Sequence, residues 1–186
     1  MSQERKDLIR SFGAEVRLVT PEEDGFLGSI KMTEEWAART PGGFLPCQFS
    51  NENNVNAHYM TTGPEIWAQL QVHGLDPDAF VAGVGTGGTV MGVGKYLKEK
   101  SPAVKILARL GLGVGISSGA NLIAALMLQE KMGKDAVVVT IFSDDNKNYL
   151  STDLMKEEPV KPGFLSTDVE LLGFGSVNRV CDFCMK

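Results

Sequence analysis

The sequence has few cysteines, no long apolar run and no excess of positive charge. Three cysteines, an odd number in 186 residues, argue against a disulfide framework and favour a reducing compartment, so we expect a cytoplasmic protein. No apolar run approaches the roughly 20 residues of a membrane-spanning helix, and the charged start MSQERKDLIR lacks the apolar core of a signal peptide. A net charge of −5 offers no basic surface for nucleic acid. We therefore expect neither a membrane nor a nucleic acid as a partner.

Metal ligands are also scarce. Cys181 and Cys184 form one C-x-x-C pair, with Cys47 far away in the sequence and only His58 and His73 as histidines. One such pair does not make a four-ligand zinc set. We interpret the pair as reduced thiols in a tail, and we expect no metal site.

The composition, 43% apolar and 22% charged, is that of an ordinary globular domain. Helix-like and strand-like periodicities alternate along the chain, which predicts an α/β fold with a twisted, mostly parallel sheet covered by helices on both faces. We expect one such domain over residues 1–155 and an irregular tail over 156–186. The expected strands are 15–20, 43–49, 79–84, 104–108 and 136–142, and the expected helices are 2–12, 21–40, 58–73, 89–100 and 119–132.

Some details of this prediction depend on single segments. Residues 79–84 and 136–142 are apolar apart from Thr140, so we expect both to be central strands. Residues 51–56 are polar and are expected to form a loop. Trp36 and Trp67 are expected in the core, because aromatic side chains dominate buried area.

A glycine-rich stretch, Gly-Val-Gly-Thr-Gly-Gly-Thr at residues 83–89, lies between an expected strand and an expected helix. A helix N-terminus offers unpaired N–H groups and a partial positive charge, and glycines let the backbone approach a ligand. Thr86 and Thr89 add hydroxyl groups suited to a phosphate with several oxygens. The alternative is a turn that only packs the strand on the helix. The density of Gly and Thr exceeds what a turn needs, so we favour a phosphate site.

The kind of phosphate follows from what surrounds the stretch. Gly83, Gly85 and Gly88 match G-x-G-x-x-G, but a dinucleotide site also needs an acidic residue about 20 residues further on, after the next strand. Arg109 stands there instead. No Gly-Lys-Ser/Thr follows, which argues against a nucleotide P-loop. A single terminal phosphate, as on pyridoxal 5'-phosphate (PLP), fits best, and a dinucleotide-binding enzyme remains an alternative.

A second motif, Gly-Ile-Ser-Ser-Gly at residues 115–119, leads into an expected helix. Ser117 or Ser118 can cap that helix. The same hydroxyl can instead contact a heteroaromatic ring nitrogen. A neutral partner leaves such a nitrogen unprotonated, which favours elimination and replacement over transamination.

Several stretches resemble, in order, the cysteine synthase (O-acetylserine sulfhydrylase) group of fold-type II PLP enzymes. The resemblance covers nearly the whole chain through Thr152, and cystathionine β-synthase is a close relative with much of the same pattern. It implies an incomplete fold-type II domain, similar to the tryptophan synthase β subunit, and a homodimer. The matching stretches are Gln48-Phe49-Ser50-Asn51, His58, Thr-Thr-Gly-Pro-Glu-Ile-Trp at 61–67, Ala-Gly-Val-Gly-Thr-Gly-Gly-Thr at 82–89, Gly-Val-Gly at 92–94, the motif at 115–119 and Tyr-Leu-Ser-Thr at 149–152.

The resemblance implies a cofactor, PLP, and residues that hold it. Ser117 or Ser118, with Ser117 favoured, faces the pyridine nitrogen, and Gln48 reaches the substrate carboxylate. In the family reaction, a transferase step of cysteine biosynthesis, O-acetylserine loses acetate and sulfide adds to give cysteine. The family's cleft also accepts the C-terminal peptide of serine acetyltransferase. The residues implied to hold the cofactor phosphate are Gly85, Thr86, Gly87, Gly88 and Thr89.

The chain departs from the family pattern in ways that bear on catalysis. The family's cofactor-binding lysine and its Ser/Thr-Gly-Asn-Thr loop correspond to positions before Met1. A second gap, of several dozen residues, lies near Ala108-Arg109, and residues 144–148 replace a usual Ser-Gly-x-Arg. Lys95 and Lys98 follow the glycine stretch but are expected at the surface. We therefore predict no catalytic residue in the chain and no activity of the chain alone. Alternatives are a non-catalytic module that binds a phosphate ligand or a partner protein, and a cystathionine β-synthase-like activity.

Overall fold

The computed structural model describes residues 2–109, 117–143 and 172–173. The chain forms two compact units, Met1–Asn51 and Glu52–Lys186. The domain boundary expected between residues 155 and 156 lies outside the described residues. Among the residues described, no helix combines the length and the apolar character needed to cross a membrane. The same residues hold no group of three or more His, Cys, Asp or Glu side chains arranged to bind a metal ion.

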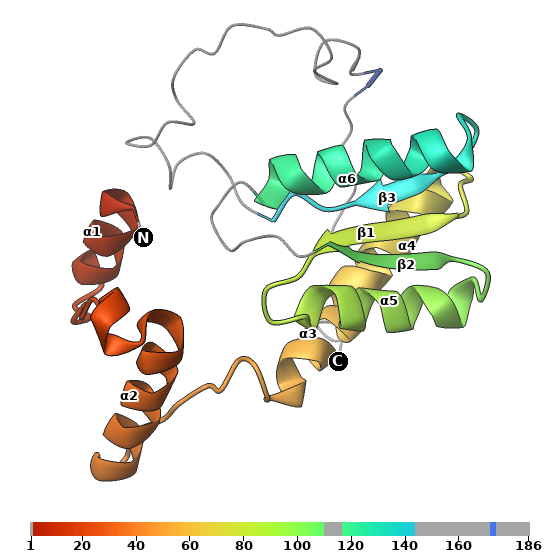
Figure 1. The fold of residues 1–186 in the computed structure, drawn as a ribbon. Helices are drawn as coiled ribbons and strands as arrows, with labels where there is room; N and C mark the ends of the chain where they lie inside the picture. The colour runs from red at the N-terminus through yellow and green to blue at the C-terminus, as the bar shows by residue number, and fades with distance from the viewer. Residues whose placement is uncertain (1, 110–116, 144–171, 174–186) are drawn as a thin grey trace, which may run out of the picture. The chain divides into compact units, whose positions relative to one another are not determined.

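The first unit is built from helices (Figure 1): α1 over Gln3–Ser11, the short 3-10 helix η1 over Pro21–Glu23, and α2 over Gly25–Arg39. Ser2 caps α1 by accepting a hydrogen bond from the backbone N–H of Arg5, and Gly13 follows the helix with φ +80°. Serine is a favoured residue at a helix N-cap, and glycine is favoured just after a helix end. The helix expected over 21–40 is confirmed with one break, at Asp24, whose φ is 60°.

Neither strand expected in this unit exists. Residues 15–20 and 43–49 carry no strand, so these two predictions are wrong. A strand needs a partner for its ladder, and the described residues of this unit provide none. Leu18 is 56% exposed, so the apolar residues of this alternating segment do not pack on a sheet. Cys47, with φ 49°, turns the second segment by accepting hydrogen bonds from the N–H groups of Ser50 and Asn51.

The second unit contains a parallel three-stranded sheet in the order β2-β1-β3. Its strands are β1 (Ala79–Gly83), β2 (Lys105–Arg109) and β3 (Val138–Thr140), with Ala79 opposite both Lys105 and Val138. Figure 1 shows α6 on one face of the sheet and α4 and α5 on the other. The predicted fold class, a parallel α/β sheet covered on both faces, is confirmed. The helices are α3 (Glu52–Met60), α4 (Thr62–Val72), α5 (Gly88–Lys100) and α6 (Ser117–Met132).

Three details of this unit differ from the sequence prediction. Residues 51–56 are not a loop, because α3 begins at Glu52. The helix expected over 58–73 is divided between two helices, α3 and α4, which meet at Thr61. Pro64 lies in the first turn of α4, where its missing N–H costs no helical hydrogen bond. β3 has three residues and lies at the edge of the described sheet rather than in its centre.

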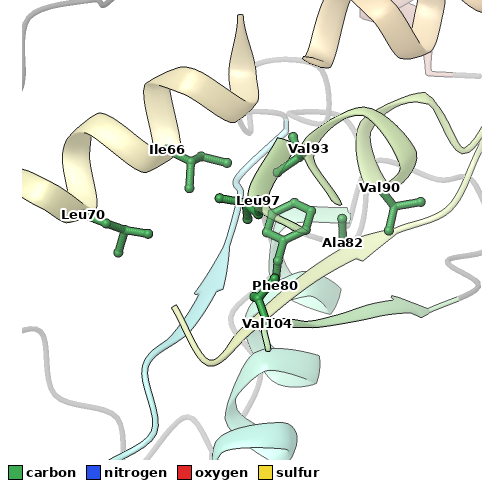
Figure 2. Packing of buried hydrophobic residues seen from close by; sticks show 8 residues of the cluster. All are labelled: Ile66, Leu70, Phe80, Ala82, Val90, Val93, Leu97 and Val104. Atoms are coloured by element: carbon green, nitrogen blue, oxygen red, sulfur yellow. The ribbon is translucent and has the colours of Figure 1, made fainter. Parts of the chain in front are cut away.

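The core lies between the sheet and the helices α4 and α5 (Figure 2). Phe80 of β1 and Val93 and Leu97 of α5 are fully buried, as is Val104 just before β2. Trp67 packs partly buried against this cluster, as expected, whereas Trp36 is 57% exposed and is not a core residue. The core holds β1 against α5 and so fixes both ends of the loop between them. The cluster consists of Ile66, Leu70, Phe80, Ala82, Val90, Val93, Leu97 and Val104.

Candidate phosphate-binding site

The glycine stretch forms the connection between the carboxyl end of β1 and the start of α5. Gly87 has φ +84°, a left-handed conformation that favours glycine, and it turns the chain into the helix. The first N–H of α5 with a helical acceptor is that of Met91, which bonds to the carbonyl oxygen of Gly87 at 3.0 Å. No hydrogen bond joins the N–H of Thr89 or Val90 to another described group. These N–H groups and the helix dipole make this end of α5 attractive to an anion.

The space at the turn of the loop is open. A Cβ atom built on Gly85 or on Gly87 would meet no atom within 4 Å. Gly85 and Thr86 are exposed. A ligand can therefore reach the backbone of the loop, which is what the phosphate interpretation requires.

Two threonine hydroxyls flank the turn, and each is held by a side chain of α3. The hydroxyl oxygen of Thr86 accepts a hydrogen bond from Nδ2 of Asn54 at 2.8 Å and a longer one from the N–H of Gly88 at 3.4 Å. The hydroxyl of Thr89 lies 3.1 Å from Nε2 of His58. α3 thus lies directly behind the loop.

His58 joins three helices. Its Nδ1 atom lies 2.9 Å from the hydroxyl oxygen of Thr62 at the start of α4, while Nε2 faces Thr89 of α5. Burial lowers the pKa of this imidazole from its ordinary value, so the ring is neutral at neutral pH and uses one nitrogen as donor and the other as acceptor. The contacts are those of a hydrogen-bonded structural histidine rather than a catalytic one.

Glycines in α5 allow α3 to come this close. A Cβ on Gly92 would lie 2.7 Å from Cβ of His58 and 2.9 Å from the backbone nitrogen of Tyr59. A Cβ on Gly88 would overlap the side-chain amide of Asn54. Gly88 is buried, so packing against α3 is enough to require glycine at this position.

The second motif begins α6, which starts at Ser117. β1 and β2 are parallel, so both end at the edge of the sheet where α5 and α6 begin (Figure 1). Ser118 is half-buried. Asn121, one turn further along and only 3% exposed, accepts a hydrogen bond from the N–H of Gly83 at 2.7 Å and donates to the carbonyl oxygen of Ile141 at 3.0 Å. The start of α6 is therefore tied to the start of the glycine loop.

Sequence reasoning missed both asparagines. Asn54 falls in the segment expected to be a loop, so no helix face was assigned to it. Asn121 carries a signal that could have been used, because it interrupts an otherwise apolar run, and a polar side chain in a buried run needs partners.

Gln48, implied to bind the substrate carboxylate, belongs to the first unit. There it lines a cavity of about 320 Å³ with Phe26, Ile30, Leu45 and Phe49 among others. Its role toward a substrate stays a prediction.

The lysines that follow the loop are at the surface, as predicted. Nζ of Lys95 lies 4.6 Å from the ring centroid of Tyr59, and Nζ of Lys98 donates to the carbonyl oxygen of Pro102 at 3.0 Å. Both side chains are exposed and engaged on the outer surface of α5.

The donor set fits the phosphate of PLP: N–H groups at a helix start, two hydroxyls, and open space before the backbone. The family described as pyridoxal-phosphate dependent enzymes matches residues 1–108. A cysteine synthase of Staphylococcus aureus is 34% identical over 210 aligned positions, covering 83% of this chain and 66% of that protein. Cysteine synthase B of Campylobacter jejuni is 35% identical, covering 83% of this chain and 68% of that protein.

Solved structures are similar as well. A hydrogen sulfide-producing enzyme of Fusobacterium nucleatum is 46% identical with a TM-score of 0.84, covering 97% of this chain and 71% of that one. An O-acetylserine dependent cystathionine β-synthase of Helicobacter pylori is 29% identical with a TM-score of 0.71, covering 83% and 67%.

The chain spans 66% of the length of the S. aureus protein. The alignment has 210 positions, whereas 83% of 186 residues is about 154, so about 56 aligned positions have no residue in this chain. The family match ends at residue 108, beside the junction where the sequence analysis places a gap. The extent of these matches confirms the resemblance seen in the sequence, and the chain belongs to the family of pyridoxal-phosphate dependent enzymes.

Proposed function

We propose that this chain binds PLP through its phosphate at the glycine loop, and that the protein acts in the replacement of a group on Cβ of an amino acid. The observation that carries the proposal is the open turn at Gly85 and Gly87, followed by unpaired N–H groups at the start of α5. In the preferred reaction, O-acetylserine loses acetate and sulfide takes its place, giving cysteine. The cysteine synthases among the relatives support this choice.

Each group of the site has a proposed role. The backbone of Gly85, Gly87 and Gly88 and the hydroxyls of Thr86 and Thr89 hold the phosphate. When bound, PLP supplies an electron sink for charge that develops at the substrate Cα.

Two further residues act on other parts of the bound molecules. The serine motif at the start of α6, Ser117 or Ser118, places a neutral hydroxyl at the ring nitrogen. Such a partner keeps the nitrogen unprotonated and favours replacement over transamination. Gln48 binds the substrate carboxylate.

A second candidate is the release of hydrogen sulfide from cysteine, in which the bond between sulfur and Cβ breaks and water or another nucleophile takes the place of sulfur on Cβ. It is favoured by the 46% identity to a hydrogen sulfide-producing enzyme over 97% of this chain. The two reactions share their chemistry and differ in whether the bond between sulfur and Cβ forms or breaks. Cystathionine β-synthase-like activity, with a larger thiol in place of sulfide, is the third member of this class and is supported by the H. pylori structure.

A polypeptide of these 186 residues alone is proposed to bind the cofactor without turning over substrate. Its own partners would then be a phosphate-bearing ligand, the C-terminal peptide of serine acetyltransferase, or a second copy as in a homodimer. A cytoplasmic location is part of the proposal, because the few cysteines, odd in number, favour a reducing compartment.

The proposal is tested by titrating the purified chain with PLP and following absorbance, with inorganic phosphate as competitor. We expect PLP to bind, phosphate to displace it, and pyridoxal, which lacks the phosphate, to bind more weakly. NADH fluorescence is expected to stay unchanged. Failure of both PLP and phosphate to bind would show that the loop is only a packing turn.

A further inference from the structure

The side-chain amide of Asn54 meets the phosphate loop at two adjacent points. Its Nδ2 atom donates a hydrogen bond to the hydroxyl oxygen of Thr86 at 2.8 Å. The same amide lies against the Cα of Gly88, where an added Cβ would overlap it. One side chain of α3 therefore contacts both the exposed threonine of the turn and the first residue of α5.

These contacts determine the direction in which the hydroxyl of Thr86 can donate its hydrogen. Its oxygen already accepts from Nδ2 of Asn54 and, at 3.4 Å, from the N–H of Gly88. A hydroxyl has one hydrogen to donate and two lone pairs to accept with. With both acceptor positions taken, the hydroxyl hydrogen is left to donate to another group, and Thr86 is exposed at the open turn. An incoming phosphate oxygen is an acceptor of the required kind.

The glycine stretch contributes little to this geometry beyond the long contact from the N–H of Gly88. Gly85, Gly87 and Gly88 have no side chains, and glycine has the greatest backbone freedom of any residue. α3, by contrast, is held tightly, because Gly92 lets its backbone pack against α5. Asn54 and His58 are four residues apart on α3 and so lie on one face of the helix, and that face reaches Thr86 and Thr89.

We propose that Asn54 is a positioning residue for phosphate binding: it holds Thr86 with its hydroxyl hydrogen directed to the ligand. This inference rests on the proposed function, because it assigns a role in binding the PLP phosphate. Asn54 acts through Thr86 and does not touch the ligand.

The test compares PLP and pyridoxal affinities of the full chain for wild type, Asn54→Ala, Asn54→Asp, Thr86→Val and the double variant of Asn54→Ala with Thr86→Val. Asn56→Ala is the matched control, since Asn56 is exposed on the same helix. Urea unfolding of each variant reports stability separately. Inorganic phosphate, followed by the amide resonances of the loop, provides a second readout that needs no cofactor.

Asn54→Ala is expected to weaken PLP binding roughly tenfold, the effect of losing about one oriented hydrogen bond, and to leave pyridoxal affinity unchanged. Asn54→Asp should weaken PLP more, because a carboxylate accepts the Thr86 hydrogen and repels the phosphate. In the Thr86→Val background, Asn54→Ala should change PLP affinity less than about twofold, since the hydroxyl through which it acts is gone. Asn56→Ala should bind as wild type does.

Three results would overturn the inference while leaving the proposed function standing, provided that wild type binds PLP. They are equal losses of PLP and pyridoxal affinity in Asn54→Ala, additive effects of Asn54→Ala and Thr86→Val, and wild-type PLP affinity in Asn54→Asp. If wild type binds neither PLP nor phosphate, the proposed function fails and the role of Asn54 with it.

Discussion

The Nε2 atom of His58 lies 3.1 Å from the hydroxyl oxygen of Thr89. This contact connects an imidazole whose pKa is lowered by burial with the helix start proposed to hold the phosphate. Because Nδ1 of the same ring faces Thr62, a change in the charge of His58 affects α3, α4 and α5 together.

The first prediction concerns pH. Burial lowers the pKa of His58 below its ordinary value of 6.5, so the unfolded chain binds this proton more readily than the folded one. The free energy of unfolding should therefore fall as the pH drops from about 7 through 6.5 and below, and level off once the folded ring is also protonated. In His58→Gln, which can still form hydrogen bonds, urea unfolding should show a shallower fall over the same range. His73 is present in both proteins, so an equal slope in the two would show that His58 is not responsible.

A second prediction concerns the turn at Gly87. Valine in place of this glycine has to adopt a φ of +84°, which costs about 1 to 3 kcal/mol for a residue with a side chain. The loop will relax away from this conformation, and we expect PLP-phosphate affinity to fall by more than about tenfold. Gly74→Val is the matched control, because Gly74 also has a positive φ, of 64°, with open space around it and follows α4. Gly74→Val should lower the free energy of unfolding and leave the PLP-phosphate affinity unchanged. Wild-type affinity in Gly87→Val would contradict the assigned site.

A third prediction separates packing from binding within the glycines. Gly92→Ala forces a Cβ against His58 and the backbone of α3, so it should lower the free energy of unfolding by about 1 to 3 kcal/mol. At Gly85 the added methyl meets nothing within 4 Å, so Gly85→Ala should unfold within about 0.5 kcal/mol of wild type. The same methyl occupies space that a ligand needs, and phosphate affinity should drop. Chemical denaturation measures the free energy of unfolding of each variant, and phosphate titration measures the affinity of each.

The sequence predicts the second unit well because its signals are local and mutually consistent. β1 is apolar on both faces, a glycine-rich turn follows it, and α5 has apolar residues at helical spacing, so the strand, loop and helix are all found where the pattern places them. The same consistency led to the proposal that this loop binds a phosphate. The arrangement of α3 behind the loop was out of reach, because it depends on contacts such as that of Asn54 with Thr86, which are 32 residues apart.

The first unit shows where such reasoning fails. Residues 15–20 alternate as a strand does, yet alternation predicts a strand only when a neighbouring strand is there to complete the ladder. Trp36 was expected in the core because of its size. It is exposed, since the described residues of this unit form no core of buried apolar side chains. Composition could not reveal either outcome.

The last prediction concerns catalysis. Family chemistry needs a lysine that binds the cofactor and then moves the proton at Cα. No lysine of this sequence stands in the motif that the resemblance implies, and Lys95, Lys98 and Lys100 of α5 are engaged with Tyr59, the carbonyl oxygen of Pro102 and Tyr96. Without a positioned base the reaction loses roughly 10²- to 10⁴-fold in rate. We therefore expect the polypeptide of these 186 residues, supplied with PLP, O-acetylserine and sulfide, to form no cysteine above the rate with PLP alone, even where it binds the cofactor.

The measurement is a cysteine assay run beside the S. aureus cysteine synthase as a positive control, with PLP binding recorded on the same samples. Binding without turnover is the expected result, and it would separate cofactor binding at the proposed phosphate site from catalysis. The same samples supplied with cysteine, assayed for sulfide, address the second candidate reaction. Turnover in either direction at roughly 1 to 10³ per second, the range of ordinary enzymes, would mean that one of the chain's own lysines serves as the base, and replacing each lysine in turn would identify it.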